Sequence, residues 1–151
     1  SRENNKIKMT GIIAGNFDVI HPGYIYMFSE MSKLCEVVHI LLHIDPSLER
    51  PEKLKPVLDV WDRLVVLKSL RQIDLITPYA TENDLLDLLI EINPDVRFLG
   101  DDYKDKMFTG SGLPIPIHYI NRKHGWSTTL FKKLIHSEYE KRIDREQKGL
   151  L

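Results

Sequence analysis

Four short stretches of the sequence combine residue types that bind anions, and the first follows an apolar run. Residues 15–23 read GNFDVIHPG, so the chain leaves a strand at Gly15 and starts a helix near His21, with proline suited to the first turn. The open start of a helix offers free N–H groups and a positive dipole end, and both attract phosphate. Gly15 and Gly23 have no side chain to block a close approach. Proline and glycine are also common punctuation at helix starts, but their combination with Asp18 and His21 favours an anion site.

A cationic loop is the second candidate. Arg50, Lys53 and Lys55 fall within Asp45–Asp59, which contains three prolines, and Arg63 follows in the next helical segment. Lysine and arginine in a loop are usually solvated surface residues. They are also the cations that bind phosphate groups, so both interpretations stay open.

The third stretch places carboxylates and an aromatic residue after an apolar segment. In residues 98–104, FLGDDYK, Asp102 and Tyr103 come just past the expected end of a strand. Side chains of these types can form a turn or line a pocket at the edge of a sheet. The residues alone favour neither interpretation.

Hydroxyl groups open the last helical segment. Ser127, Thr128 and Thr129 stand at its start, and Arg122 lies just ahead of them. Capping a helix needs one hydroxyl, so two are spare for anion oxygens, which the helix dipole also favours. Trp126 is more often a packing residue than a recognition residue, although it is also placed to form the wall of a pocket.

Strand-like and helix-like segments alternate along the chain. The expected strands are Ile7–Gly15, Glu36–Ile44, Asp74–Pro78, Asp95–Gly100 and Ile115–Ile120, and the expected helices are His21–Cys35, Val60–Ile73, Thr81–Pro94 and an amphipathic closing helix over Thr128–Ile143. The alternation predicts a Rossmann-like α/β fold, a doubly wound parallel sheet of five strands with helices on both faces. Such sheets bind ligands at the carboxyl ends of their strands. The four stretches all follow strands, so they are expected to meet at one edge.

Composition narrows the class of protein. The chain has 151 residues and a net charge of −1 without a block of like charges, so no nucleic-acid or membrane partner is expected. Cys35 stands alone and is expected to be a buried thiol in a reducing, cytoplasmic location. No apolar run reaches membrane length. We expect a flexible leader over residues 1–8 and a single domain over residues 9–151. The histidines after residue 21 show no metal-ligand spacing, and His39 and His43 are expected to pack in their strand.

The first stretch carries a family resemblance. GNFDVIHPGY, residues 15–24, resembles the G-x-F-D-x-x-H-x-G-H signature of the nucleotidyltransferase superfamily that contains the cytidylyltransferases. In that family both histidines meet the nucleotide phosphates and steady the charge that develops as pyrophosphate leaves. His21 matches the first, and Tyr24 replaces the second. A phenol donates one hydrogen bond but is not cationic at neutral pH. The replacement indicates either a variant enzyme with another cation in that role or a site that binds without turnover.

The resemblance covers residues 9–134. The R-x-x-G-x-S-T-T motif of the family is matched at Arg122, Gly125 and Ser127–Thr129, and this motif favours cytidylyl over adenylyl transfer. The implied catalytic residues are His21, Tyr24, Lys55 and Arg122. The implied nucleotide-binding residues are Gly15, Asn16, Phe17, Asp18, His21, Gly23, Arg63, Asp102, Tyr103, Ser127, Thr128 and Thr129, with Asp45, Lys53 and Trp126 as further candidates. Mg²⁺ is implied as a cofactor carried on the triphosphate, with no protein side chain assigned to it.

The function implied by the resemblance is transfer of CMP from CTP to a small phosphorylated alcohol or sugar, like glycerol 3-phosphate, with release of pyrophosphate. The resemblance also implies that the protein is a homodimer. One alternative is an adenylyltransferase of the same fold, similar to FAD synthetases. Another is a degenerate nucleotide-binding module without catalysis. The loop Lys104–Pro114 is placed to shape the acceptor pocket, but its residues do not specify the acceptor.

Overall fold

The computed structural model describes residues 8–150. The strands are β1 (Thr10–Gly15), β2 (Val37–His43), β3 (Leu75–Tyr79), β4 (Val96–Gly100) and β5 (Ile117–Ile120). The helices are α1 (Pro22–Leu34), α2 (Val60–Lys68), α3 (Glu82–Ile92) and α4 (Thr128–Gln147), with 3₁₀ turns η2 (Pro46–Leu48) and η3 (Asp101–Tyr103). All but one residue of the expected leader lies outside the described residues.

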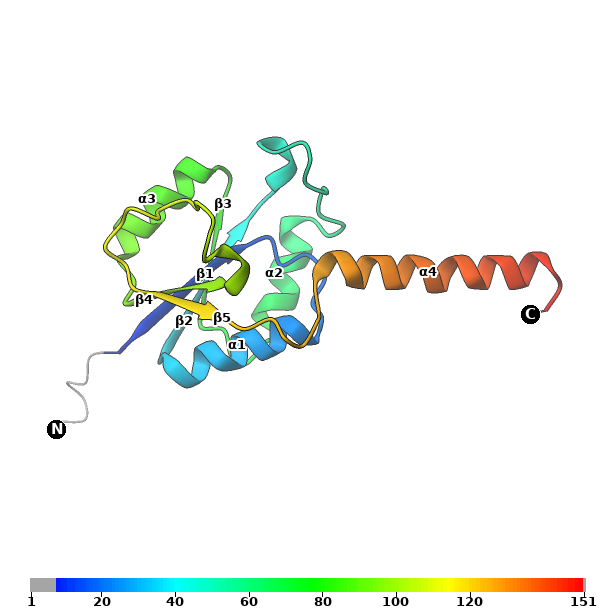
Figure 1. Cartoon of the computed structure of the whole chain (residues 1–151), viewed down its shortest axis with the longest axis horizontal. Coiled ribbons are helices and arrows are strands. Elements are labelled where there is room, and N and C mark those ends of the chain that lie inside the picture. The colour runs from blue at the N-terminus through cyan, green and yellow to red at the C-terminus, as the bar shows by residue number, and fades with distance from the viewer. Residues whose placement is uncertain (1–7, 151) are drawn as a thin grey trace.

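The five strands of the described chain form one parallel sheet in the order β3-β2-β1-β4-β5. The chain runs outward from β1 to β3, then returns to place β4 against the other side of β1, so the strand order reverses between β1 and β4 (Figure 1). The predicted doubly wound parallel sheet is confirmed. In such sheets the crevice at this reversal, outside the carboxyl ends of the strands, is the usual ligand site.

Helices cover both faces of the sheet and make two apolar cores. On one face, Phe28 and Met31 of α1 and Leu67 of α2 pack against the sheet. On the other, Leu85 and Leu89 of α3 pack there. The thiol of Cys35 is buried in the first core, as predicted. The sheet edge is therefore held rigid from both sides, which fixes the loops that follow the strands.

Local signals set where the helices begin and end. Asp59 caps α2 by accepting the Asp62 N–H, and Thr81 forms a capping box with Asp84 at α3. The helix expected over Val60–Ile73 ends early, at Lys68, because the next residue, a serine, bonds back to the last turn through its N–H and its hydroxyl.

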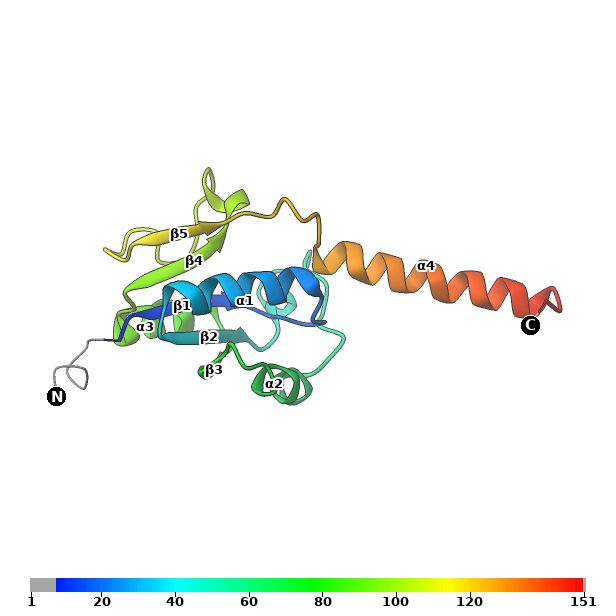
Figure 2. The ribbon, with the colours of Figure 1, turned by 90° about the horizontal axis from the view of Figure 1, so that it is seen from below.

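The last helix departs from expectation. α4 extends to Gln147 and projects away from the sheet, and no residue of this fully described helix is buried (Figures 1 and 2). The amphipathic pattern thus does not pack this helix onto its own sheet; only the first turns touch the domain. Farther out, ion pairs one turn apart, such as Arg142–Glu146, support the exposed helix. Within the described chain, we find no helix both long and apolar enough to cross a membrane.

Candidate active site

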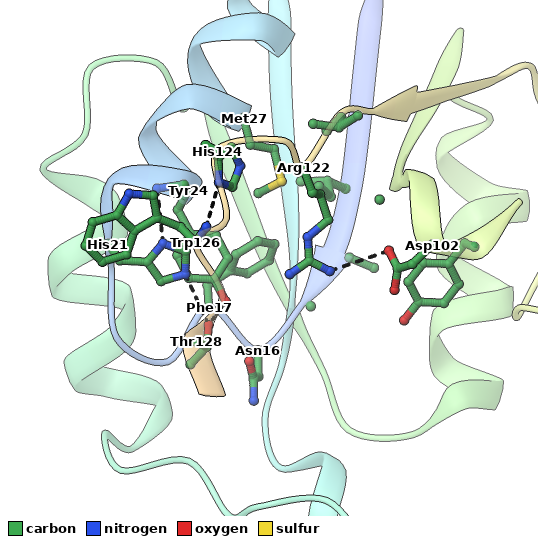
Figure 3. Close-up of a pocket in the computed structure, with 17 residues that line it drawn as sticks. Asn16, Phe17, His21, Tyr24, Met27, Asp102, Arg122, His124, Trp126 and Thr128 are labelled. Carbon is green, nitrogen blue, oxygen red and sulfur yellow. Dashed lines mark hydrogen bonds and ion pairs between the residues drawn. The ribbon is translucent and has the colours of Figure 1, made fainter. Parts of the chain in front are cut away.

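The carboxyl ends of β1, β4 and β5 border a cavity of about 220 Å³, the first cavity. It is lined by Ile13, Ala14, Gly15, Asn16, Phe17, His21, Gly23, Tyr24, Met27, Gly100, Asp102, Tyr103, Ile120, Arg122, His124, Trp126 and Thr128. Figure 3 shows the rings of the α1 start on one side and Arg122 facing Asp102 on the other. Most of the residues singled out in the first, third and fourth stretches therefore come together at one site.

His21 lies at the start of α1 and caps that helix with its ring. Its Nδ1 accepts a hydrogen bond from the Gly23 N–H at 3.1 Å, so in the neutral ring the proton lies on Nε2. Nε2 faces the Thr128 hydroxyl at 3.4 Å. Burial, and then the nearby His124 and Arg122, lower the pKa of His21. The site thus contains a neutral imidazole with an N–H donor at Nε2.

Tyr24 follows on the same face of α1. Its hydroxyl lies 2.5 Å from Thr128 Oγ1, and its ring stacks on His21 with the centroids 4.3 Å apart. Burial is the main cause that raises the pKa of Tyr24, so the phenol stays protonated. Both side chains converge on the Thr128 hydroxyl in the first turn of α4, and this joins the starts of the two helices.

Gly23 is required by packing. A Cβ at this position would lie 2.8 Å from His21 Cε1 and Trp126 Cβ, and 2.9 Å from His124 Cε1. Trp126 stacks nearly parallel to the His21 ring. The glycine therefore lets three side chains close around the start of α1. The sequence indicated only that a glycine here would let a phosphate approach, and did not reveal this packing role.

Phe17 turns the chain off β1. It has a φ of 46°, in the left-handed region that non-glycine residues adopt at a cost. Its buried ring packs edge-on against Tyr24 and also against Phe28. The turn places the Asn16 side chain in the first cavity while the phenylalanine anchors the loop.

Asp18, predicted to contact the nucleotide, is used by the fold instead. Its buried carboxylate accepts the N–H groups of Val57 at 2.7 Å and Leu58 at 2.9 Å, and it forms an ion pair with Lys132 at 2.6 Å. Burial alone would raise the pKa of Asp18, but Lys132 and the two N–H groups together lower it. Asp18 therefore ties the end of the cationic loop to α4 and does not line the first cavity.

Arg63, also predicted to contact the nucleotide, instead holds nearby backbone segments in place. Its side chain is buried, with the residue only 1% exposed. Nε donates to the Leu58 carbonyl, Nη1 to the carbonyls of Asn16 and His43, and Nη2 to that of Ile44. Four N–H groups are thus committed to backbone oxygens. Arg63 fixes the chain where β1 and β2 end, and few of its N–H groups are left to bind a triphosphate.

The two lysines of the cationic loop are exposed, whereas Asp45 and Arg50 are partly buried. Asp45 caps η2 by accepting the N–H and hydroxyl of Ser47, so its predicted ligand role has no support in this geometry. Lys55 is exposed and outside the lining of the first cavity, although the neighbouring residues 57 and 58 are anchored. Its phosphate contact stays a prediction. Lys53 lines a different cavity, described below.

The predicted hydroxyl cluster is divided in its roles. Ser127 caps α4 by accepting the Leu130 N–H, and Thr129 is exposed outside the cavity lining. Only Thr128 among the three lines the first cavity. Arg122 does line it, and its Nη1 lies 3.5 Å from Asp102 Oδ1 across the opening. This half-exposed guanidinium is free to turn toward an anion.

Two further residues line the first cavity, and the sequence signalled each of them only weakly. Met27 lines the first cavity, one turn along α1 from Tyr24, and helical spacing could have indicated it. His124 also lines it, although its only signal was its place inside the R-x-x-G-x-S-T-T run.

A second cavity of about 600 Å³ lies on the α3 side and shares the end of β1 with the first. Its lining includes His43, Arg50, Lys53, Tyr79, Glu82, Arg97 and the loop residues 107–109. The loop Lys104–Pro114 therefore does border a pocket. Sequence reasoning gave no ligand role to His43 or Arg97.

The side chains of residues 8–150 form no metal cage. Within the described residues, no group of three or more His, Cys, Asp or Glu side chains is arranged to hold a metal ion. Mg²⁺ is usually bound through one or two carboxylates together with substrate phosphate oxygens and water, and does not need a cage made of protein side chains alone.

The fold and this site define a nucleotidyltransferase-type α/β protein, with a helix start, an arginine and a second cavity at the switch point of a parallel sheet. Residues 12–137 match the family model described as cytidylyltransferase-like, and the chain belongs to that family. The resemblance in the sequence is thereby confirmed.

Relatives and solved structures are consistent with this membership. The chain is 32% identical over 131 residues to the bifunctional protein HldE of Haemophilus influenzae strain PittGG, a match that covers 82% of this chain and 26% of that protein. It is 35% identical over 95 residues to the FAD synthase of Methanohalophilus mahii, covering 62% and 65%. The chain thus spans about a quarter of the length of the HldE relative.

Two solved structures share the fold. A lipopolysaccharide core biosynthesis protein from Thermoplasma volcanium GSS1 has a TM-score of 0.60 at 24% identity, covering 76% of this chain and 95% of that one. Pantothenate synthetase from Thermus thermophilus has a TM-score of 0.55 at 13% identity, covering 83% and 64%. At these identities the likeness concerns the fold alone.

Proposed function

We propose that the chain is a cytidylyltransferase that moves CMP from CTP to a small phosphorylated alcohol or sugar. The observation that carries the proposal is the meeting, in the first cavity, of the His21 N–H donor, the start of α1 and the half-exposed Arg122 guanidinium, which is held by one long contact to Asp102. These groups provide hydrogen-bond donors and a cation on two sides of an anion. A second cavity that shares the end of β1 leaves room for an acceptor beside the nucleotide.

In the proposed reaction an oxygen of the acceptor phosphate attacks the α-phosphorus of CTP. A new P–O bond forms, the bond from the α-phosphorus to the bridging oxygen of the β-phosphate breaks, and pyrophosphate leaves with the electron pair. The acceptor phosphate is already ionised, so no general base is needed. The protein contributes position and charge neutralisation. His21 Nε2 donates to a phosphate oxygen in place of the Thr128 hydroxyl, while Arg122 and Lys55 supply positive charge. Mg²⁺ belongs to the triphosphate in this proposal.

The choice of CTP rests on the Arg122–Thr129 run, which resembles the cytidylyl motif. Adenylyl transfer remains the second candidate, because one relative is an FAD synthase and FAD is an adenine dinucleotide. A cytoplasmic location, a homodimer and a single domain over residues 9–151 stay predictions from the sequence.

The test measures pyrophosphate release with CTP or ATP, Mg²⁺ and a panel of phosphorylated alcohols and sugars. Release with CTP and one acceptor would support the proposal, and release with ATP alone would transfer it to the adenylyl class. If calorimetry shows CTP binding while no pyrophosphate is released, the enzyme proposal fails for that panel.

Tyr24→His is the matched variant for the binding-module alternative, because it restores the residue of the family signature. If turnover appears only in this variant, the natural chain is a lost catalyst. If both proteins turn over at similar rates, the phenol is tolerated by the reaction.

A further inference from the structure

The second cavity contains a buried cation without a carboxylate partner. Arg97 is only 4% exposed; its Nη1 donates to the Thr109 carbonyl, and its Nε has no partner among the described residues. No ion pair of Arg97 occurs within residues 8–150. A buried charge is costly unless an opposite charge or full hydrogen bonding compensates it. The Phe108 ring lies 5.2 Å from the guanidinium carbon of Arg97, so an aromatic face partly compensates this charge, but no carboxylate is paired with it among the described residues.

The remaining charges of the second cavity point the same way. Arg50 and Lys53 add positive charge at the loop side, and Glu82 is the one carboxylate in the lining. Glu82 is already engaged, since one oxygen lies 3.2 Å from Arg50 and the other accepts the Thr109 hydroxyl at 2.7 Å. Three cations against one occupied carboxylate favour an anion.

His43 adds a hydrogen-bond acceptor to the cavity wall. It is 3% exposed, stacks on Tyr79 with the centroids 4.6 Å apart, and its Nε2 has no partner among the described residues. Burial is the main cause that lowers the pKa of His43, while a hydrogen bond with the Ala80 backbone opposes this shift. The lowered pKa favours the neutral ring, which offers a lone pair on one nitrogen as well as an N–H on the other. A lone pair of this kind suits a hydroxyl donor from a ligand.

The position of the cavity connects it to the reaction. Residues 13–16, Gly100 and Tyr103 line both cavities, so the two meet at the end of β1. His43 lies one residue past the strand partner of Gly15, at the level of this shared edge. In-line transfer needs the acceptor and the leaving group on opposite sides of the phosphorus, and adjoining cavities meet that need.

We propose that the second cavity binds the acceptor as a phosphorylated polyhydroxy compound, with His43 accepting a hydrogen bond from one of its hydroxyls and Arg97, with Arg50 and Lys53, holding its anionic charge. This inference rests on the proposed transfer and narrows its acceptor. Phosphates of amino alcohols such as choline fit poorly, because their cationic head would meet three cations and a lone free nitrogen.

The experiment compares phosphates that differ only in their hydroxyls. Calorimetry measures the binding of sn-glycerol 3-phosphate against n-propyl phosphate, and of sorbitol 6-phosphate against n-hexyl phosphate, with and without α,β-methylene CTP. We expect at least one hydroxylated member to bind roughly tenfold or more tightly than its partner, since a buried acceptor left unpaired rejects the analogue. Phosphocholine should bind more weakly than that member. If neither hydroxylated compound is preferred, or phosphocholine binds best, the inference is wrong.

Variants assign the effect to residues. His43→Phe keeps a ring against Tyr79 but removes the acceptor, so the preference for the hydroxylated compound should shrink to about twofold or less, while His43→Gln should keep part of it. His39→Gln is the matched control, because His39 lies on the same strand face, bonds to Thr77 and lines neither cavity. Arg97→Gln should weaken all the phosphates and Arg97→Lys should weaken them less. Equal effects of the His39 and His43 variants would overturn the assignment.

The two proposals fail separately. Selective binding that depends on His43, with no pyrophosphate released from CTP or ATP, would keep the second site and overturn the transfer. Pyrophosphate release that is unchanged in the His43 and Arg97 variants would keep the transfer and overturn the site. Circular dichroism melts verify that each variant is folded before it is compared.

Discussion

Replacing Asp18 by asparagine tests whether this buried carboxylate holds the cationic loop and α4 in place. The carboxylate is fully buried and bonds to the N–H groups of Val57 and Leu58 and to Lys132. An asparagine offers one acceptor oxygen and turns an NH₂ group toward another donor. Charged hydrogen bonds contribute about 1.5–3 kcal/mol and an unpaired buried donor costs about 1–3 kcal/mol, while Lys132 can turn to water. We expect Asp18→Asn to lower the free energy of unfolding by about 2–4 kcal/mol.

Chemical denaturation at neutral pH measures this loss, and a double-mutant cycle with Lys132→Met identifies its source. The pair should be coupled by about 1 kcal/mol or more, because the two side chains share one contact. A loss below about 0.5 kcal/mol for Asp18→Asn, which is the usual range of surface substitutions, would refute the reasoning. Strict additivity in the cycle would refute the role of Lys132.

The same variant carries a pH signature. The pKa of Asp18 is lower in the folded chain than its ordinary value, so its stabilisation is fully present above the unfolded value of about 3.9 and is lost as the pH falls through the folded value. The stability difference between the natural chain and Asp18→Asn should therefore shrink in acid. A difference that grows below pH 4 would contradict this assignment.

Three further predictions concern the start of α1 and the facing arginine. Gly23→Ala should cost about 1–3 kcal/mol of stability by overpacking, visible as a lower melting temperature, since its Cβ would lie within 2.9 Å of three side chains. Arg122→Gln should lower kcat/KM of the proposed transfer by roughly 10²–10³ with an unchanged melting temperature, because this half-exposed side chain makes one long contact. Burial lowers the pKa of His21, so stability should fall as the pH drops below the unfolded value of about 6.5. His21→Asn, a neutral cap, should make that slope shallower and leave the part that comes from the buried His39 and His43.

The fold was largely predictable because its signals are local. Apolar runs bounded by turns marked the strands, and caps such as Asp59 and Thr81 marked where helices begin. The exposure of α4 was not predictable, because an amphipathic pattern indicates only that a face can be covered and does not say by what. Side chains of α4 form ion pairs with one another along the helix, and none of its residues is buried against the sheet.

The site was predictable where the chemistry is local to a helix start or to the end of a strand. His21, Gly23 and Thr128 followed from sequence spacing and lie at the first cavity. Asp18 and Arg63 carry the same charges as ligand-binding residues, but most of their partners are backbone groups 19 to 47 residues away along the chain. Asp18 also pairs with the side chain of Lys132, on the last helix. Side-chain type cannot distinguish an anion contact from a backbone contact when the partner lies on a distant loop.

The place of His43 in the second cavity was missed for a related reason. A histidine inside an apolar strand usually packs with its polar atoms satisfied, and His39 does so through Thr77. His43 has the same sequence context, yet its Nε2 has no partner among the described residues. The difference depends on the neighbouring strand and the loop after β4, which no local pattern encodes.

The replacement at position 24 shifts the charge of the first cavity onto other residues. The phenol of Tyr24 is neutral and bonded to Thr128, and the His21 ring is kept neutral by burial and by the bond that Nδ1 accepts. In the proposed transfer, the positive charge for the leaving pyrophosphate would come from Arg122 and Lys55. Asp18 anchors the end of the loop that carries Lys55 and, through Lys132, the start of α4 beside the Arg122 run. A carboxylate that touches no ligand would thus decide whether the two cations converge, so Asp18→Asn should impair turnover more than nucleotide binding.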